Sequence, residues 1–472
     1  MSELGGVTTL REAAVELAVA PSGTRVLRFF FELPIEDAWV LLPGLSDHPS
    51  RIAAWHSEED GSFVAGGVAW EATLEGESRF RQASEAWTEL NSQCIHVAAL
   101  EQDQTLPFCL SGFAFSHNTP GSADWEGWGD GRLWLPEWVV ARVGDRCRAV
   151  LNARITESDD TDATVERLVQ RMKWLKRLCG APVEHDGNDA GLLAKAAQSA
   201  KAEAEWVRRV QEARQALESG QVQKVVLARS EEFSSESGSF DGIATAFRMR
   251  RQQAGCTVFL VRRRGGQAFV GATPEELIRR NGRTISTMSL AGTRRRDEQL
   301  DEELGEELLR SEKDRHEQVL VTQAMTQALM PMVEELVLAR VPELAKLADV
   351  QHLRTRLHGT LRGEIDLFRL AEALHPTPAV GGLPRTEALA WISENEELDR
   401  GWYAGPIGWL RPDGDGLLVV AIRSVLLNAE RARAFVGCGL VEDSDPSTEW
   451  EESEAKLQPA ARGLAPSHSK EG

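Results

Sequence analysis

The chain has 472 residues, enough for a large buried core, and its length alone suggests about two to three domains. It carries 53 Lys and Arg against 73 Asp and Glu, and the resulting net charge of −20 argues against a nucleic-acid or anionic-membrane partner. A small anionic substrate would need local arginine, lysine or a metal ion to receive it.

The pattern of cysteines and the lack of long apolar segments favour a cytoplasmic location. The six cysteines are scattered and include no Cys-x-x-Cys pair, so neither a disulfide framework nor a zinc site is expected. The first residues lack a basic region followed by an apolar core, and no apolar run approaches the ~20 residues that span a bilayer. We therefore expect a cytoplasmic protein with reduced thiols, without a signal peptide and without a membrane partner.

The first third of the chain has a mostly strand-like pattern, from Val26 to about Arg154. Short apolar stretches such as 26–33 and 132–140 alternate with clusters of Gly, Pro, Asp and Asn. The tryptophans and phenylalanines in this part are typical of a core. No motif here carries chemistry by itself.

Two helices and a boundary are predicted next. Residues 160–180 and 189–219 have helical patterns, and Gly220 is a suitable stop for the second. The polar residues between the helices divide the chain into a β-rich N-terminal segment, 1–185, and a catalytic segment, 186–463, which need not be independent domains. The tail 464–472 is small and polar and is expected to be disordered.

Lys224 stands at the entry of an apolar run, Val-Val-Leu-Ala, that is predicted to be a buried strand. A lysine held in a desolvated site can lose its proton near neutral pH and act as a base. The alternative is an edge-strand lysine in water, which is the commoner case for an isolated lysine.

Glu275 follows a predicted strand and the Thr-Pro dipeptide 273–274, which restricts the local backbone. A carboxyl group in such a place can be kept protonated and serve as a general acid. The alternative is a turn glutamate that caps a helix.

A first acidic pair follows the strand that ends in Gly292 and Thr293, whose amides and hydroxyl are suited to an anion. An acidic helix is predicted at about 297–310, and Ser311 then opens another helix with the pattern of a capping box. On this second helix Asp314 and Glu317 are three residues apart and share one face.

A second acidic pair lies near the end of the chain. A strand ends in Gly437 and Gly439, and a helix follows with Asp445 as N-cap and Pro446 in the first helical position. On its face lie Glu449, Glu452 and Lys456. If the two acidic pairs face one another they can hold Mg²⁺, which takes a few carboxylates and keeps several waters. The alternative is a solvated helix with a Glu452–Lys456 ion pair.

Between the two acidic pairs lie His352, the Pro- and Gly-rich stretch 374–385, and Tyr403. Arg423 then ends a hydrophobic strand, where a guanidinium can bind a carboxylate through two hydrogen bonds. A structural ion pair is the alternative for this arginine.

In this order and spacing, the motifs resemble the chorismate-binding enzyme family, which includes isochorismate synthases, salicylate synthases, the large subunit of anthranilate synthase and aminodeoxychorismate synthase. The resemblance covers about residues 222–460, and the N-terminal half fits the family's variable segment only loosely. It implies an α+β fold of two stacked, mostly antiparallel β-sheets flanked by helices, with strands from both halves of the chain.

The resemblance also implies roles for individual residues. Lys224 is similar to the base that activates water for attack at carbon 2 of chorismate, and Glu275 to the acid that protonates the departing 4-hydroxyl. Glu317 and Glu452 match direct Mg²⁺ ligands, and Asp314 and Glu449 match residues that support the ion through water. The residues that match substrate-binding positions are Gly292, Thr293, His352, Tyr403, Arg423, Gly439 and Lys456.

Within the family the pattern most resembles isochorismate synthases. Ala291 stands where aminodeoxychorismate synthases carry a lysine, and the form of residues 374–382 is that of isochorismate synthases. The long N-terminal segment and the Gly-Gly-Leu-Pro variant favour the menaquinone pathway. Since water is the nucleophile, no obligatory amidotransferase subunit is expected. The alternatives are a siderophore-pathway isochorismate synthase, a salicylate synthase that also releases pyruvate, and a non-catalytic protein that binds chorismate or a metal.

Overall fold

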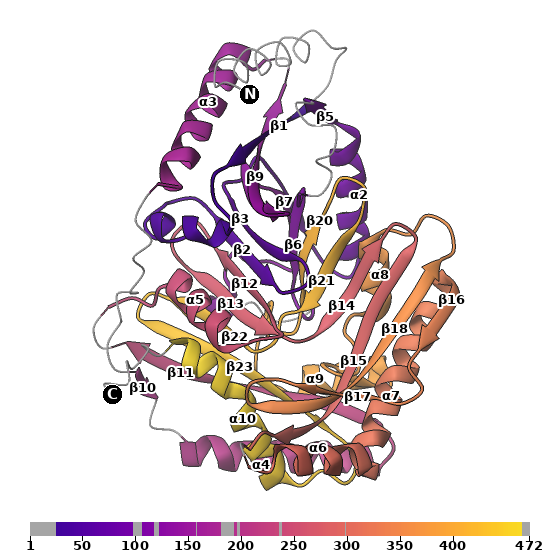
Figure 1. Ribbon diagram of the computed structural model, residues 1–472. Coiled ribbons are helices and arrows are strands. Elements are labelled where there is room, and N and C mark those ends of the chain that lie inside the picture. Colours follow the sequence, from indigo (N-terminus) through magenta and orange to yellow (C-terminus); the bar gives the residue numbers. More distant parts are fainter. Residues whose placement is uncertain are drawn as a thin grey trace.

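Two large β-sheets with helices packed against them form the protein (Figure 1). The structure, a computed structural model, describes residues 25–97, 106–117, 122–156, 158–180, 193–195, 199–235, 238–297 and 299–464.

The first sheet has 13 strands among the described residues. Neighbouring strands are antiparallel, except that β1 and β5 are parallel. In spatial order the strands are β10 (Leu193–Lys195), β11 (Lys224–Ser235), β23 (Arg431–Leu440), β22 (Ser424–Asn428), β13 (Ala268–Thr273), β12 (Thr257–Arg262), β2 (Ile52–Ser57), β3 (Gly61–Gly66), β8 (Trp138–Val143), β9 (Arg146–Ile155), β1 (Arg25–Leu33) and β5 (Cys94–Val97), with β19 (Gly382–Leu383) beside β11.

The second sheet has 10 strands among the described residues, and all of its pairings are antiparallel. In spatial order the strands are β16 (Val333–Leu338), β18 (Val350–Leu361), β15 (Thr284–Arg295), β14 (Glu276–Asn281), β21 (Gly416–Val420), β20 (Pro406–Leu410), β6 (Cys109–Phe113), β7 (Gly131–Leu135) and β4 (Trp70–Leu74), with β17 (Glu343–Lys346) beside β18.

Both sheets combine strands from the two halves of the chain. In the first sheet β2 pairs with β12, and in the second β6 pairs with β20. This mixing confirms the predicted fold of two mostly antiparallel sheets with strands from both halves. Residues 181–192, where the segment boundary is predicted, lie outside the described residues.

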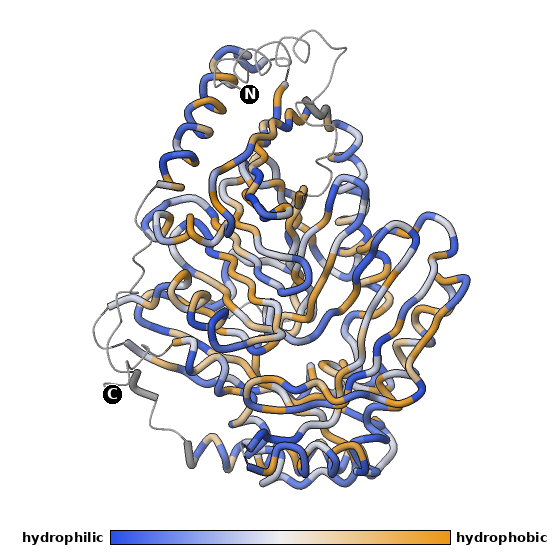
Figure 2. Tube along the Cα trace, viewed as in Figure 1, coloured by the Kyte–Doolittle hydropathy of each residue, from blue (hydrophilic) through white to orange (hydrophobic). Residues whose placement is uncertain are grey.

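Apolar side chains from both sheets share one large core, in which aromatic rings are prominent. Phe259 and Phe269 of the first sheet pack together with Trp125 and Trp128, and Trp128 in turn packs against Trp402. In Figure 2 the strands in the middle of the molecule are mostly orange, whereas the outer helix α3 alternates between blue and orange. This alternation is the pattern of a helix that buries one face only.

The helices cover the sheets: α7 packs on β15 and β18, α5 on β12 and β13, and α10 on β23. The bounds of the described helices are α2 (Arg79–Ser92), α3 (Thr161–Leu178), α4 (Ser199–Glu218), α5 (Gly242–Gln252), α6 (Asp301–Arg310), α7 (Glu312–Leu329), α8 (Leu367–Leu374), α9 (Arg385–Asn395) and α10 (Pro446–Leu464), and the short 3₁₀ turns are η1 (Ala38–Leu41), η2 (Pro43–Leu45), η4 (Ala123–Trp125) and η5 (Met330–Met332). Within these described ranges, no helix has the length and apolar character that crossing a membrane requires.

Several predicted elements differ from the structure. The mostly strand-like N-terminal segment also contains helix α2, which packs on β4 and β7. The stretch 132–140 is not one strand but two, β7 and β8, which lie in different sheets. Pro136 separates them, because a proline lacks the N–H that would continue a strand ladder.

The ends of some predicted helices also shift. The helix predicted over 189–219 begins at Ser199, because Leu193–Lys195 form strand β10 against β11. The acidic helix begins at Asp301 rather than 297. At the other end, α10 continues through Leu464, whose side chain is buried, so the predicted tail loses its first residue to this helix. Residues 465–472 lie outside the described residues.

Candidate active site

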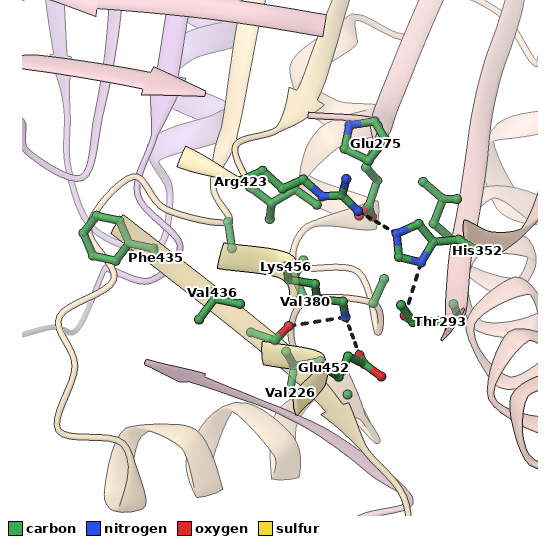
Figure 3. Close-up of a pocket in the computed structure, with 18 of the residues that line it drawn as sticks. Val226, Glu275, Thr293, His352, Val380, Arg423, Phe435, Val436, Glu452 and Lys456 are labelled. Atoms are coloured by element: carbon green, nitrogen blue, oxygen red, sulfur yellow. Dashed lines mark hydrogen bonds and ion pairs between the residues drawn. The ribbon is translucent and has the colours of Figure 1, made fainter. Parts of the chain in front are cut away.

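Most of the predicted site residues meet in one pocket at the end of β23, bordered by α10, β15, α7 and β18 (Figure 3). The pocket encloses about 750 Å³, its open mouth included, which is within the range of small-molecule sites. Among its lining residues are Glu275, Gly292, Thr293, Glu317, His352, Tyr403, Arg423, Gly439, Glu452 and Lys456. Lys224, Asp314 and Glu449 lie directly behind this lining.

Lys224 is fully buried and forms an ion pair with Glu317, whose Oε1 lies 2.8 Å from the lysine Nζ. The edge-strand alternative for this lysine is therefore wrong. Burial alone would raise the pKa of Glu317, but the ammonium groups of Lys224 and Lys456 outweigh it and the pKa is lowered. Glu317 thus stays ionised at the pocket wall, and Lys224 lies directly behind it.

The position of Lys224 depends on a strand partner and on a nearby glycine. Its strand β11 pairs with β19, so that Lys224 lies opposite Leu383 at the end of the Pro- and Gly-rich stretch. A Cβ at Gly439 would lie 2.8 Å from Glu317 Oε1 and 2.9 Å from Lys224 Cε. Only glycine at 439 leaves room for this ion pair, because any side chain would displace one of the two partners.

Glu275 lies between β13 and β14 with 4% of its surface exposed. Its N–H donates to Thr273 Oγ1 at 3.1 Å, and Thr377 Oγ1 lies 3.5 Å from its Oε1. Burial raises the pKa of Glu275 to about 7, although Lys224, Thr377 and other neighbours act to lower it. The helix-cap alternative is wrong, because strand β14 follows this residue. At neutral pH a large part of the Glu275 population is protonated and can donate a proton.

His352 and Arg423 form a buried hydrogen-bonded pair at the upper end of the pocket in Figure 3. Arg423 donates from NH2 to His352 Nε2 at 2.7 Å, so the imidazole is neutral at Nε2. Burial, and then the charges of Arg423 and Lys456, hold the pKa of His352 well below its usual range. Its Nδ1 lies 3.1 Å from Gly292 O and 3.2 Å from Thr293 Oγ1.

Arg423 has the properties of an anion receptor. Its backbone is left-handed, with φ of 51°, which is unusual for a residue with a side chain. Its NH1 is buried and has no hydrogen-bond partner among the described residues. Burial lowers the pKa of Arg423, yet a guanidinium remains charged at neutral pH. A carboxylate entering the pocket would supply the missing acceptor.

Lys456 and Glu452 form the ion pair that the helical spacing indicates, with 2.6 Å between Nζ and Oε1. The helix is not a solvated one, because both side chains line the pocket and Lys456 Nζ also lies 3.5 Å from Gly437 O. Burial would lower the pKa of Lys456, but Glu452 outweighs it and raises the pKa. Lys456 is therefore a second fixed cation for an anionic substrate.

Gly292 and Tyr403 shape two further walls. Gly292 has φ of 68° at a bulge between β15 and β18, where a left-handed backbone favours glycine. Its N–H donates to Glu317 Oε2 at 3.2 Å. The amide that the sequence offers to an anion therefore already binds a carboxylate of the protein. Tyr403 is buried, stacks on Phe435 with 5.2 Å between ring centroids, and has its pKa raised by burial.

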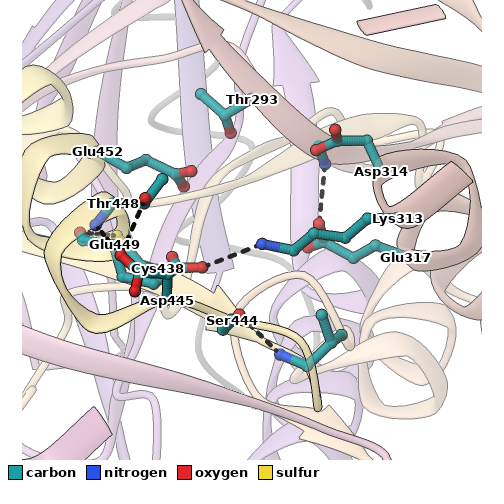
Figure 4. A network of polar contacts seen from close by, with 12 residues as sticks. Thr293, Lys313, Asp314, Glu317, Cys438, Ser444, Asp445, Thr448, Glu449 and Glu452 are labelled. Carbon is teal, nitrogen blue, oxygen red and sulfur yellow. Dashed lines mark hydrogen bonds and ion pairs between the residues drawn. The ribbon is translucent and has the colours of Figure 1, made fainter. Parts of the chain in front are cut away.

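The two acidic pairs approach the pocket from opposite sides (Figure 4). Glu317 and Glu452 line it, whereas Asp314 and Glu449 lie behind and are bound by cations: Asp314 by Arg294 at 3.0 Å and Glu449 by Lys313 at 3.4 Å. Burial, followed by repulsion from Glu452, raises the pKa of Glu449 to about 7. A carboxylate-rich donor set under this repulsion fits a hard divalent cation such as Mg²⁺.

Two residues of the site, Arg400 and Thr377, are not predicted from the sequence. Arg400 lines it, is buried, and forms an ion pair with Glu396 at 2.6 Å while donating to Val226 O and Val380 O. The i,i+4 spacing of Glu396 and Arg400 was the available signal. Thr377, which contacts Glu275, lies in the stretch already recognised as rigid, but nothing local indicated which carboxyl it would meet.

Three comparisons bear on this geometry. The family model described as "Chorismate binding enzyme" matches residues 18–465. A salicylate biosynthesis isochorismate synthase from Pseudomonas aeruginosa is 35% identical over 456 residues, covering 96% of this chain and 93% of the relative. Isochorismate synthase MenF from Bacillus subtilis is 31% identical over 417 residues, covering 86% and 87%.

Solved structures agree on the fold. That of MenF, the menaquinone-specific isochorismate synthase from Escherichia coli, has a TM-score of 0.75 at 24% identity and covers 97% of this chain and 100% of that chain. Anthranilate synthase component I from Streptococcus pneumoniae has a TM-score of 0.66 at 21% identity, over 84% and 91%. At these identities the likeness concerns the fold.

Proposed function

Because the chain belongs to the chorismate-binding enzymes, we propose that it converts chorismate to isochorismate. The proposal depends mainly on the environment of Glu275. This residue is a buried carboxyl with a pKa of about 7, and it lies in the same pocket as the cations Arg423 and Lys456. A dianionic substrate needs such cations, and departure of its 4-hydroxyl needs a proton donor. Relatives named isochorismate synthase support the assignment over most of the chain.

The proposed reaction is a substitution with an allylic shift. Lys224 first releases to solvent the proton that it holds in its ion pair with Glu317. Water then adds at carbon 2 while its proton passes to the free amine Nζ of Lys224, and Glu317, 2.8 Å away, stabilises the ammonium that results. The 4-hydroxyl leaves as water after it takes the proton of Glu275. One water enters and one leaves, so the product is an isomer and no redox cofactor takes part.

The same pocket would orient the substrate. Arg423 NH1, Lys456 Nζ and the Tyr403 hydroxyl are the groups that would bind its carboxylates, beside the bare backbone of Gly437 and Gly439. His352 holds the Arg423 guanidinium through its NH2, which leaves NH1 for the substrate. In this arrangement Arg423, Lys456 and Tyr403 bind the anionic substrate locally, although the protein as a whole has a negative net charge.

We propose Mg²⁺ as the cofactor, with Glu317 and Glu452 as ligands and Asp314 and Glu449 in support. When bound, the ion would offset the negative charge of the substrate carboxylates and of the four acidic side chains. Since water is the nucleophile, the proposal includes no amidotransferase subunit. A cytoplasmic location fits the six free cysteines.

The fate of the product is a separate proposal. The long N-terminal segment and the Gly-Gly-Leu-Pro motif favour menaquinone synthesis. The second candidate is salicylate synthesis, favoured by the 35% identity to the Pseudomonas aeruginosa relative named for that pathway. Deleting the gene in its own organism and measuring menaquinone and salicylate separates the two.

The activity itself is tested by incubating purified protein with chorismate, with and without Mg²⁺, and separating the products. We expect a Mg²⁺-dependent isochorismate peak without pyruvate. Salicylate with pyruvate would replace the proposal by a salicylate synthase, and unchanged chorismate that still binds would indicate a non-catalytic binding protein.

A further inference from the structure

Cys438 occupies a position on β23 that the proposed reaction does not use. Gly437 and Gly439 face the pocket, so the side chain between them points to the other face of the strand, where α10 packs. The thiol is fully buried, and its Sγ lies 3.5 Å from the backbone oxygen of Glu449 in the first turns of that helix.

The carboxylates of Glu449 and Glu452, both on α10, lie close to this thiol. One ligand atom from each of Cys438, Glu449 and Glu452 lies within 4.8 Å of the other two, and the three are grouped at the left of Figure 4. Among the residues that the structure describes, no other group places a thiol and two carboxylates this close together.

Glu449 supplies an independent sign of a missing ligand. Its side chain is 3% exposed, and its Oε2 is buried without a hydrogen-bond partner among the described residues. A buried carboxylate oxygen without a partner is costly, since its hydration is lost and nothing replaces it. A cation at this place would supply the partner.

We infer that Cys438, Glu449 and Glu452 form a site for a thiophilic divalent metal ion such as Zn²⁺ or Cd²⁺. Thiolate sulfur favours these ions, whereas Mg²⁺ takes oxygen ligands almost exclusively. Binding replaces the thiol proton, which passes to solvent, by a metal–sulfur bond. Two carboxylates and water complete the coordination.

The site shares two residues with the proposed Mg²⁺ site, the proposed ligand Glu452 and the supporting Glu449. Glu452 lines the pocket and also belongs to the thiol group, so it cannot serve both ions in full. A thiophilic ion held by Cys438 therefore inhibits the enzyme by withdrawing Glu452, and a large excess of Mg²⁺ does not relieve the inhibition. Two lysines compete with the metal, Lys313 for Glu449 and Lys456 for Glu452.

Direct binding tests the site without reliance on the proposed activity. The probe is Cd²⁺ alone, titrated into the full chain in excess Mg²⁺ and followed by thiolate-to-metal charge-transfer absorption in the ultraviolet. We expect one Cd²⁺ per chain with this absorption, and about tenfold or greater loss of affinity in Cys438→Ser. Cys256→Ser, which removes another buried thiol, is the matched control and keeps the binding.

Three further measurements complete the test. Glu449→Gln keeps the thiol but should weaken Cd²⁺ binding by a similar factor, and thermal unfolding of each variant establishes that it is folded. In the activity assay, Zn²⁺ should inhibit the wild type but not Cys438→Ser, whose activity with Mg²⁺ alone stays unchanged. Unaltered Cd²⁺ binding in Cys438→Ser, or its loss in Cys256→Ser, would overturn the proposal even if the protein is an active isochorismate synthase.

Discussion

Nζ of Lys224 lies 2.8 Å from Oε1 of Glu317, and the lysine side chain is fully buried. The proposed base and one proposed metal ligand are therefore direct neighbours. Any group that binds Glu317 also changes the surroundings of Lys224, so the proposed acid–base chemistry and the proposed metal binding in this pocket depend on one another.

Lys224→Ala should lower turnover by about 10²–10⁴-fold, the usual contribution of a positioned base, while chorismate binding is largely retained. Binding is retained because Arg423 and Lys456 remain in place. Turnover and calorimetric chorismate binding are the measurements, and Lys173→Ala on the exposed face of α3 is the control. Activity like that of the wild type would exclude Lys224 as the base.

Glu452→Gln should raise the Mg²⁺ concentration needed for half-maximal activity by about tenfold or more, because an amide is a weaker ligand for a hard cation than a carboxylate. A Mg²⁺ titration of the activity measures this. The neighbouring Glu451→Gln, also on α10 but exposed, is the control. An unchanged titration in Glu452→Gln would remove this residue from the metal site.

The pH profile of activity should fall as the pH rises through about 7. Glu275 has its pKa raised to about 7 by burial, and only its protonated form can donate to the leaving hydroxyl. Glu275→Gln should be nearly inactive at every pH, whereas Glu394→Gln on the exposed face of α9 should keep the wild-type profile. A wild-type rate that stays constant from pH 6 to pH 9 would contradict the role of Glu275 as acid.

The same group should make stability depend on pH. The pKa of Glu275 rises on folding from its ordinary 4.5 to about 7, so its contribution to stability is fully present below 4.5 and is lost as the pH rises through 7. Above that pH the ionised buried carboxyl costs about 3 kcal/mol relative to low pH. Glu275→Gln removes this cost, and its melting temperature should exceed that of the wild type increasingly between pH 5 and pH 8. If the difference in melting temperature between Glu275→Gln and the wild type stays the same from pH 5 to pH 8, Glu275 is not buried in its ionised form.

His352→Ala should raise KM for chorismate by about tenfold, because Arg423 loses the acceptor that holds its NH2 at 2.7 Å. His352→Gln keeps an acceptor and should restore part of the loss. Since burial and neighbouring cations hold the pKa of His352 well below 6.5, no step from this histidine should appear in the activity profile above pH 6.5. Equal KM values for the alanine and glutamine variants would refute the positioning role.

Local patterns predicted much of this molecule correctly. The N-cap Asp445 accepts from Ser447 N and Thr448 N, and Ser311 accepts from Asp314 N. Such features depend on residues close in sequence, and for that reason a sequence can reveal them. Strands β7 and β8 show the limit, because the pattern of 132–140 is that of one strand and only packing assigns its parts to different sheets.

By itself, the sequence determined which chemical groups are present and in what order: a lysine before a buried strand, a glutamate after a proline, and two acidic pairs at helical spacing. The tertiary structure alone decided their partners. Lys224 meets Glu317 because Gly439 of the neighbouring strand β23 leaves space for both, and Arg423 meets His352 because β18 places its histidine at the bulge of Gly292. Contacts between residues far apart in the chain depend on strand register and backbone approach, which no local pattern encodes.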